Sequence, residues 1–192
     1  MNLNKNNLTG YLRKKKCIGS SEPILDMRQI GDGLKNQVYE VTTPEQRLIV
    51  KQAHSRVMIK ERWWTDRKRI FAEKNCIEIL ANILPPDIFP DALSEDRTDF
   101  VLVTTGPSKD AVLWDSELGG GRVDLQIAAQ AGELLASVHN LTAGVNEVKT
   151  MFKDLKAFEQ LRIQPLYESV AKSYPDIQKQ VEDFVKKAEL QE

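Results

Sequence analysis

The sequence predicts an α+β fold, with a small antiparallel sheet and one helix in the first half and only helices in the second half. Two runs of residues predict the sheet. Gln37–Thr42 alternates and is rich in β-branched and aromatic residues, and the apolar run Leu48–Ala53 follows the turn Thr43–Gln46. A third observation predicts the helical half, because apolar residues recur at helical spacing after the break Gly119–Gly121.

The same signals place the remaining elements of the first half. We expect a short helix over Asn7–Lys16 and strands over Met27–Ile30 and Phe100–Thr104. The strand Phe100–Thr104 should pair with the stretch around Ala92–Leu93. A longer helix, capped by Thr65 or Asp66, should run to about Leu84. Pro85 and Pro86 end this helix, because proline lacks the backbone N–H that a helix interior requires. We also expect Trp63 and Trp64 to pack against the sheet and Cys76 to be buried.

The second half is predicted to be a series of amphipathic helices. Their expected ranges are about Asp124–Asn140, Phe152–Leu161, Gln164–Ser173 and Asp176–Leu190. Pro175 separates the last two helices.

Composition narrows the class of protein. The chain has 192 residues, a formal net charge of −1, and 41% hydrophobic and 29% charged residues, which excludes collagen-like and disordered classes. The charge balance argues against nucleic acid as a partner, and we interpret the basic run Arg13–Lys16 as solvated surface. No apolar run approaches the ~20 residues that a membrane-spanning helix needs. Cys17 and Cys76 form neither a disulfide framework nor a metal motif, so we expect a cytoplasmic protein.

Lys51 is the first candidate for a functional side chain. Strand alternation places it on the same face as Ile49 and Ala53, in a strand that is otherwise apolar. A cation on such a face needs a partner, because an unpaired buried charge costs several kcal/mol.

Glu73 is the complementary candidate on the predicted helix. It lies three residues after Ile70 and four before Ile77, in the middle of the apolar stripe. One interpretation is a structural ion pair, with Lys51 or with the nearby Arg69; the other is a functional pair with Lys51.

Gly31, Asp32 and Gly33 form a turn between the first two predicted strands. A plain hairpin turn explains such a sequence on its own. The functional interpretation is a glycine-rich turn whose backbone N–H groups approach phosphate oxygens.

These segments together resemble a known family. Ile30–Val41 followed by Ile49–Ala53 resembles the start of the aminoglycoside phosphotransferase-like kinases, in particular their methylthioribose kinase branch. Glu73, 22 residues after Lys51, lies where that family places the glutamate that pairs with the lysine. Val101–Gly106 resembles the linker that receives adenine. The later segments Leu113–Gly121, Gly132–His139 and Met151–Glu192 resemble the opening of the helical lobe and the insertion before the catalytic loop.

The resemblance implies a protein-kinase-like fold that transfers the γ-phosphoryl group of ATP to a hydroxyl of a small molecule, with Mg²⁺ in the complete enzyme. Residues 1–104 would form the nucleotide-binding lobe, with 1–26 as an N-terminal helix and extension, and 105–192 the linker and the start of a helical lobe. The implied nucleotide-binding residues are Gly31, Asp32, Gly33 and Asn36 over the phosphates, Lys51 on the α- and β-phosphates, Glu73 orienting Lys51, and Thr104, Thr105 and Gly106 presenting backbone groups to adenine.

The sequence departs from the family at the catalytic loop. The family's His-Gly-Asp motif is absent, since neither His54 nor His139 has an aspartate two residues later, and no metal-binding aspartate follows. We therefore expect no catalytic or metal-binding residue in this chain, which would be an N-terminal portion that is inactive alone. The alternative is a non-catalytic kinase-like protein that binds nucleotide weakly or binds a partner, either a further lobe or another chain. The acceptor molecule stays open.

Overall fold

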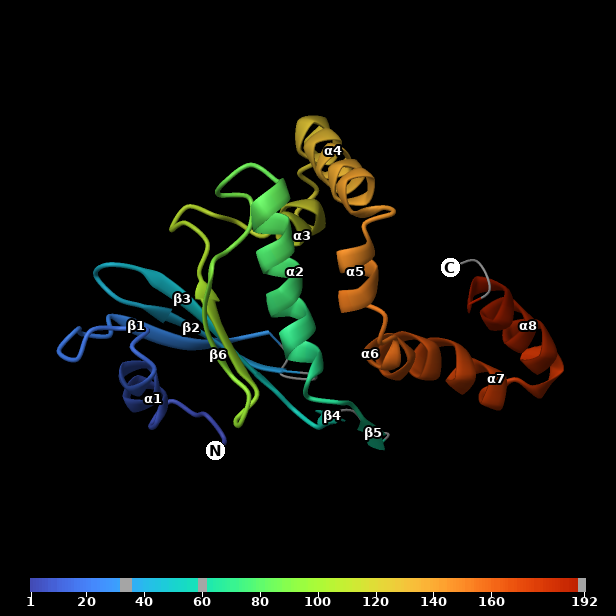
Figure 1. Cartoon of the computed structure of the whole chain (residues 1–192), viewed down its shortest axis with the longest axis horizontal. Coiled ribbons are helices and arrows are strands. Elements are labelled where there is room, and N and C mark those ends of the chain that lie inside the picture. Colours follow the sequence, from blue (N-terminus) through green and yellow to red (C-terminus); the bar gives the residue numbers. More distant parts are fainter. Residues whose placement is uncertain (32–35, 59–61, 190–192) are drawn as a thin grey trace.

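The computed structural model describes residues 1–31, 36–58 and 62–189 (Figure 1). In this part of the chain, five antiparallel strands form one sheet in the order β1-β2-β3-β7-β6. Their bounds are β1 Asp26–Ile30, β2 Asn36–Thr42, β3 Arg47–Ala53, β6 Ala92–Asp96 and β7 Val101–Thr105. A separate hairpin consists of β4 Arg56–Met58 and β5 Arg62–Trp64. The predicted α+β class and the predicted strands are confirmed.

The register of β3 decides which side chains share a face. In the antiparallel pairing of β3 with β7, Lys51 lies opposite Leu102 and Ile49 lies opposite Thr104. Cross-strand partners point to the same face of a sheet, and alternate residues of one strand do so as well. Ile49, Lys51, Leu102 and Thr104 therefore lie on one face, and their neighbours in sequence lie on the other.

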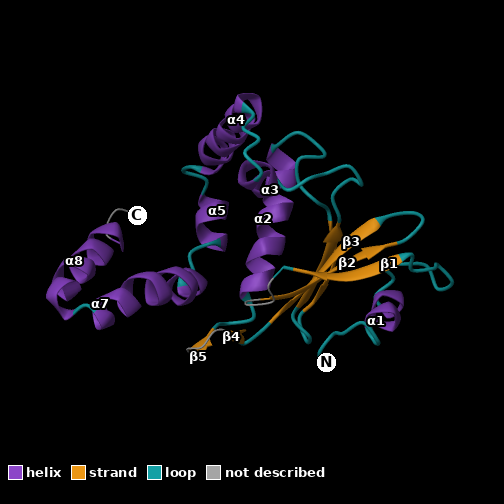
Figure 2. Ribbon diagram, turned by 180° about the vertical axis from the view of Figure 1, so that it is seen from behind, coloured by secondary structure: helices purple, strands orange, loops and turns teal. Residues whose placement is uncertain are grey.

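That other face is covered by α1 (Leu8–Lys14) and the chain that flanks it (Figures 1 and 2). The short helix is confirmed, and it belongs to the main core of the sheet. Buried side chains of this N-terminal segment are Leu3, Leu8, Tyr11, Leu12, Cys17 and Ile18, and they contact Tyr39, Val41, Leu48, Val50, Val101 and Val103 of the sheet. The first 18 residues are thus part of the fold rather than an appendage.

Gln52 fastens this segment to β3 by hydrogen bonds to the backbone. Its Oε1 accepts from the Leu3 N–H at 2.8 Å, and its Nε2 donates to the carbonyl oxygens of Met1 at 2.7 Å and Asp99 at 3.0 Å. The side chain is only 4% exposed. Buried backbone groups need partners, so this amide satisfies three of them at once.

Asp96 makes a second attachment, at the end of β6. It accepts from the Tyr11 hydroxyl at 3.1 Å and pairs with Lys15 Nζ at 2.7 Å. Burial alone would raise the pKa of Asp96, but the Lys15 contact and hydrogen bonds from the Asp99 and Thr98 amides and Tyr11 outweigh it. The pKa of this carboxyl therefore lies well below its usual range. Burial, and then the charge of Asp96, raise the pKa of Tyr11.

The opposite face of the sheet carries α2 (Arg69–Ile83). Its buried side chains Ile70, Phe71 and Ile77 contact Ala53 and Leu102. The helix begins later than predicted, because the Asp66 carboxylate accepts from the Lys68 N–H at 2.9 Å and so caps a turn that precedes the first helical residue.

The second half of the chain is helical, as predicted, but with a different division. The elements are α3 Trp114–Gly119, α4 Leu125–Thr142, α5 Asn146–Met151, α6 Lys156–Phe158, a π-helical segment Glu159–Glu168, α7 Ser169–Ser173, a 3₁₀ turn Pro175–Ile177 and α8 Gln178–Glu189. The predicted helix start at Phe152 and the predicted break before Gln164 are wrong, while residues 156–161 of that predicted helix are helical. The chain instead breaks at 152–155, and one helical path continues through Pro165, where the wider π-helical turns accommodate a residue without an N–H.

Little of this helical half is buried. Of the side chains described between residues 106 and 187, Ala171 alone is buried. Figure 1 shows the path from α6 to α8 extending away from the sheet. Large apolar side chains remain exposed on these helices and on the segments between them, among them Leu113, Val123, Leu125, Leu135 and Phe158. None of the helices in the described ranges is both long enough and apolar enough to cross a membrane.

Two smaller expectations are corrected. Trp64 is 65% exposed on the β4–β5 hairpin and does not pack against the sheet, while the side chain of Trp63 lies outside the described set. Cys76 is exposed, because α2 turns Ile77 rather than Cys76 toward the core.

Candidate functional site

Lys51 and Glu73 form an ion pair between the sheet and α2. β3 presents Lys51 on the face that α2 covers, and α2 presents Glu73 between the buried Ile70 and Ile77. Lys51 Nζ pairs with Glu73 Oε1. Of the two partners that the sequence left open for Glu73, the structure selects Lys51.

This pair is not a buried structural salt bridge. The Lys51 side chain is 29% exposed and the Glu73 side chain is 36% exposed. An ion pair with this much access to water contributes only about 0.2–1 kcal/mol to stability. Stability alone therefore gives a weak reason for two charges on an otherwise apolar interface, and both groups remain accessible to a ligand.

A pocket of about 600 Å³ opens beside Lys51. Its walls come from β3, from the segment between α2 and β6, and from the linker that follows β7. The lining residues are Ile49, Lys51, Asp87, Ile88, Phe89, Pro90, Asp91, Thr104, Thr105, Gly106, Pro107 and Ser108. The structure thus brings Lys51 and the three predicted linker residues to one cavity.

Thr104 supplies a polar group to this pocket. Its side chain lies on the same face as Ile49 and Lys51 and is only 3% exposed. Within the described part of the chain its hydroxyl has no hydrogen-bond partner. A hydroxyl can both donate and accept, so it can orient a polar ligand in the cavity.

The linker amides are arranged differently from the expectation that they face a ligand. The Thr105 N–H donates to the Asp91 carbonyl at 3.0 Å, and the Gly106 N–H donates to the Arg47 carbonyl at 2.7 Å. These two amides are therefore occupied within the chain. Pro107 has no N–H, so the next amide along the linker is that of Ser108.

Arg47 holds this linker against the sheet, a role that the sequence gave no sign of. Its guanidinium donates to the carbonyl oxygens of Pro107 at 3.3 Å and Ser108 at 2.8 Å. The same guanidinium pairs with Glu40, whose side chain is nearly buried and also pairs with Arg28 at 2.5 Å. The edge of the pocket is thereby fixed by a charged network rather than by apolar packing.

The predicted glycine turn is described only at its two ends. Gly31 leaves β1 with φ of +75°, a conformation that favours glycine, and nothing lies within 4 Å of where a Cβ would be. Asn36 begins β2, and its Oδ1 accepts from Arg69 of α2 at 2.9 Å. Asp32 and Gly33 lie outside the described residues.

Among the described residues, no group of three or more His, Cys, Asp or Glu side chains is arranged to hold a metal ion. Burial, and then the charge of Arg69, lower the pKa of His54, so this imidazole is neutral at pH 7. The pocket beside Lys51 thus combines the Lys51 ammonium, the carboxylates of Asp87 and Asp91, the Thr104 hydroxyl and the apolar side chain of Ile49.

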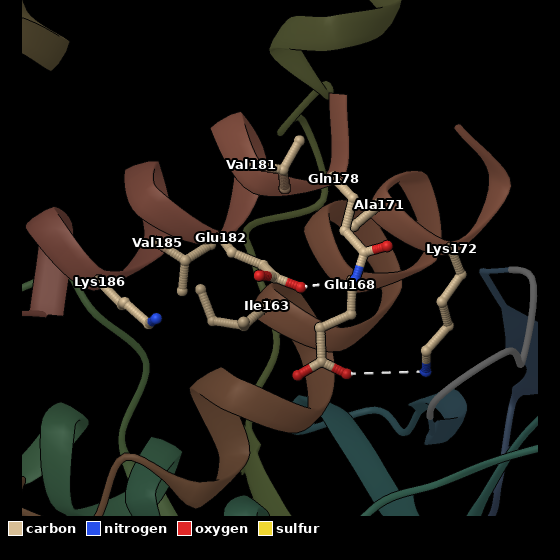
Figure 3. Close-up of a pocket in the computed structure, with 9 residues that line it drawn as sticks. All are labelled: Ile163, Glu168, Ala171, Lys172, Gln178, Val181, Glu182, Val185 and Lys186. Carbon is tan, nitrogen blue, oxygen red and sulfur yellow. Dashed lines mark hydrogen bonds and ion pairs between the residues drawn. The ribbon is translucent and has the colours of Figure 1, made fainter. Parts of the chain in front are cut away.

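A second pocket, of about 380 Å³, lies in the C-terminal helices and contains none of the predicted site residues. Figure 3 shows Ile163, Val181 and Val185 projecting into it, with the ion pair Glu168–Lys172 at its rim, 4.0 Å apart. Glu168, Lys172, Glu182 and Lys186 line it together with these apolar side chains.

No protein-family model matches this chain, and a search of curated proteins found no match.

Proposed function

We propose that this chain is the nucleotide-binding portion of a small-molecule kinase of the aminoglycoside phosphotransferase-like type, and that it binds ATP in the pocket beside Lys51. The observation that carries the proposal is the Lys51–Glu73 ion pair at the edge of a cavity that Thr104, Thr105 and Gly106 also line. Each of these residues was implied by the sequence resemblance, from segments as far apart as 55 residues.

The apolar wall of the pocket, the Thr104 hydroxyl and Lys51 support a nucleotide as the ligand, while Asp87 and Asp91 also line the pocket. Ile49 provides a partly exposed apolar wall beside the Thr104 hydroxyl, which suits a flat base with polar edges. Lys51 provides a positive charge that is not fully buried, and Glu73 holds its ammonium in place. A lysine held in this way acts as a point charge for phosphate oxygens.

Binding without turnover is the activity we propose. Phosphoryl transfer depends on positioning and charge stabilisation, including metal ions and a residue that orients the attacking hydroxyl. The sequence has no His-Gly-Asp motif, and the described residues offer no metal cluster. Transfer would need those groups from elsewhere, so no catalytic step is assigned to this chain.

Calorimetric titration with ATP tests the proposal. A charged contact of this kind contributes about 1.5–3 kcal/mol, so Lys51→Ala should weaken ATP binding at least about tenfold. Lys74→Ala is the matched control. Lys74 belongs to α2 and, like Lys51, pairs with a glutamate, Glu78 at 2.6 Å, but it takes no part in the pocket. Equal ATP affinity in wild type and Lys51→Ala would reject the site.

A second candidate function is an interaction module, and the surface area favours it. The chain exposes 13354 Å², whereas a compact monomer of 21.8 kDa exposes about 9,300 Å². The excess, roughly 4,000 Å², exceeds what one partner buries in an ordinary interface, about 800 Å². The exposed apolar residues of α3 and α4 contribute to it.

Sedimentation at micromolar concentration, together with binding of an apolar fluorescent dye, tests this candidate. An interaction module with uncovered apolar helices should bind the dye and self-associate or sediment with a partner. If the chain is monomeric and the dye fluorescence does not increase, the interaction-module candidate loses its support. The two candidates are compatible, since ATP binding depends on the sheet and α2 while the excess surface belongs to the later helices.

A further inference from the structure

We propose that Arg69 is a positioning residue of the nucleotide site, which holds the start of β2 in place over the phosphate end of the pocket. The inference rests on the proposed ATP site and adds to it a residue to which the sequence gave no role there. Arg69 is the first residue of α2, one helical turn before Glu73.

The contacts of Arg69 reach three separate parts of the fold. Its Nη2 donates to Asn36 Oδ1 at 2.9 Å, at the start of β2. Its Nη1 donates to the carbonyl of His54, just after β3, at 3.0 Å. Nη1 also donates to two groups just before α2, Thr65 Oγ1 at 2.8 Å and the Asp66 carbonyl at 3.0 Å. The guanidinium thus joins β2, β3 and α2 at one point.

A guanidinium is suited to this task and an ammonium is not. Its N–H groups form a planar fork, so acceptors on different elements become fixed at set angles to one another. Arg69 is half-buried; burial lowers the pKa of its guanidinium, and Asp66 opposes that shift. Charge-assisted hydrogen bonds in a partly dry environment are stronger than exposed ones.

The placement of these contacts relates them to the phosphates. Asn36 lies opposite Ala53 in the β2–β3 register, two residues along β3 from Lys51. The Lys51–Glu73 pair lies on the same face of the sheet as Ala53 and Asn36, between β3 and α2. A change at Arg69 should therefore alter how the start of β2 meets the phosphates, and should leave the base-binding end near Thr104 intact.

The test compares two fluorescent probes, N-methylanthraniloyl ATP and N-methylanthraniloyl adenosine, which share the base and differ in the phosphates. Arg69→Lys retains the charge but loses the fork. We expect it to raise the Kd for the ATP probe about tenfold and to change the Kd for the adenosine probe less than twofold. Asn36→Ala should have the same signature, and the double variant should be no weaker than the stronger single one, since the two residues share one contact.

Controls separate this role from general damage to the fold. Lys68→Gln removes a neighbouring exposed cation and should leave both probes unaffected. If Arg69→Lys weakens the binding of both probes equally, or changes the binding of neither, the positioning role is overturned. If Arg69→Lys changes the binding of neither probe but Lys51→Ala still weakens binding of the ATP probe, the proposed function stands without a role for Arg69. If wild-type protein binds neither probe, the proposed function and this inference fail together.

Discussion

The Gly106 N–H donates to the Arg47 carbonyl oxygen at 2.7 Å, and the two backbones approach so closely that a Cβ on Gly106 would lie 3.0 Å from Arg47 Cβ. It would also lie 3.1 Å from the carbonyl carbon and oxygen of Arg47. Glycine at this position is therefore explained by close packing of the linker on β3.

Gly106→Ala should for that reason destabilise the fold. The neighbouring atoms include backbone, which cannot move aside cheaply, so we expect a loss of about 1–3 kcal/mol in the free energy of unfolding. Gly10→Ala is the control, because a Cβ there meets nothing within 4 Å and the residue lies in α1. That change should stabilise by about 0.5–1 kcal/mol. Urea unfolding followed by circular dichroism measures both; equal effects would contradict the packing account.

The Gln52 side chain should contribute more to the free energy of unfolding than an ordinary strand residue, because it bonds three backbone groups. Gln52→Leu would leave the Leu3 N–H and the carbonyls of Met1 and Asp99 without their partner. Each unsatisfied buried group costs about 1–3 kcal/mol, so we expect a loss of about 2–4 kcal/mol if part of the segment is rehydrated.

The matched control is Gln29→Leu, at an exposed position of β1, which should change stability by less than about 0.5 kcal/mol. Amide hydrogen exchange of residues 3–12 shows whether the loss of stability is located in the N-terminal segment. These amides should exchange faster in Gln52→Leu than in wild type, and unchanged protection would show that the N-terminal segment is held by its apolar contacts alone.

The depressed pKa of Asp96 predicts how the free energy of unfolding depends on pH. Its pKa is depressed in the folded state, so its stabilising contribution is fully present above the unfolded pKa of about 3.9 and is lost as the pH falls below that value. Asp96→Asn should be less stable than wild type at pH 7, and its stability should fall less steeply between about pH 5 and pH 2. Unfolding free energies measured across this range check the sign. A parallel pH dependence in both proteins would mean that other carboxylates cause the acid sensitivity.

Periodicity predicted the sheet and the faces on which Lys51 and Glu73 lie. Alternation in β3 assigns Lys51 to a face, and the 3.6-residue period of α2 assigns Glu73 to the apolar stripe. Periodicity left Arg69 open as the other partner of Glu73, and the family resemblance implied Lys51. The contacts of Arg47 and Arg69 could not be predicted in this way. Both arginines donate to backbone carbonyls of residues distant in the chain, and such acceptors leave no pattern in the sequence.

The N-terminal segment shows a different limit. Leu8 and Leu12 have helical spacing, which predicts a short amphipathic helix but not the surface that it covers. The helical half shows a third limit. Helical periodicity predicted separate helices over about Phe152–Leu161 and Gln164–Ser173, whereas one helical path runs from Lys156 through the π-helical segment Glu159–Glu168 to Ser173.

The most direct test of the ATP site is a methyl NMR spectrum of protein labelled at isoleucine, leucine and valine methyl groups, recorded with and without ATP. Binding beside Lys51 should shift the methyl signals of Ile49 and of Ile88, which lines the same pocket, and should leave Val181 and Val185 of the C-terminal pocket unchanged. Lys51→Ala should strongly reduce those shifts at an ATP concentration near the wild-type Kd. Shifts confined to Val181 and Val185, or no shifts at millimolar ATP, would contradict the assignment of the pocket to a nucleotide.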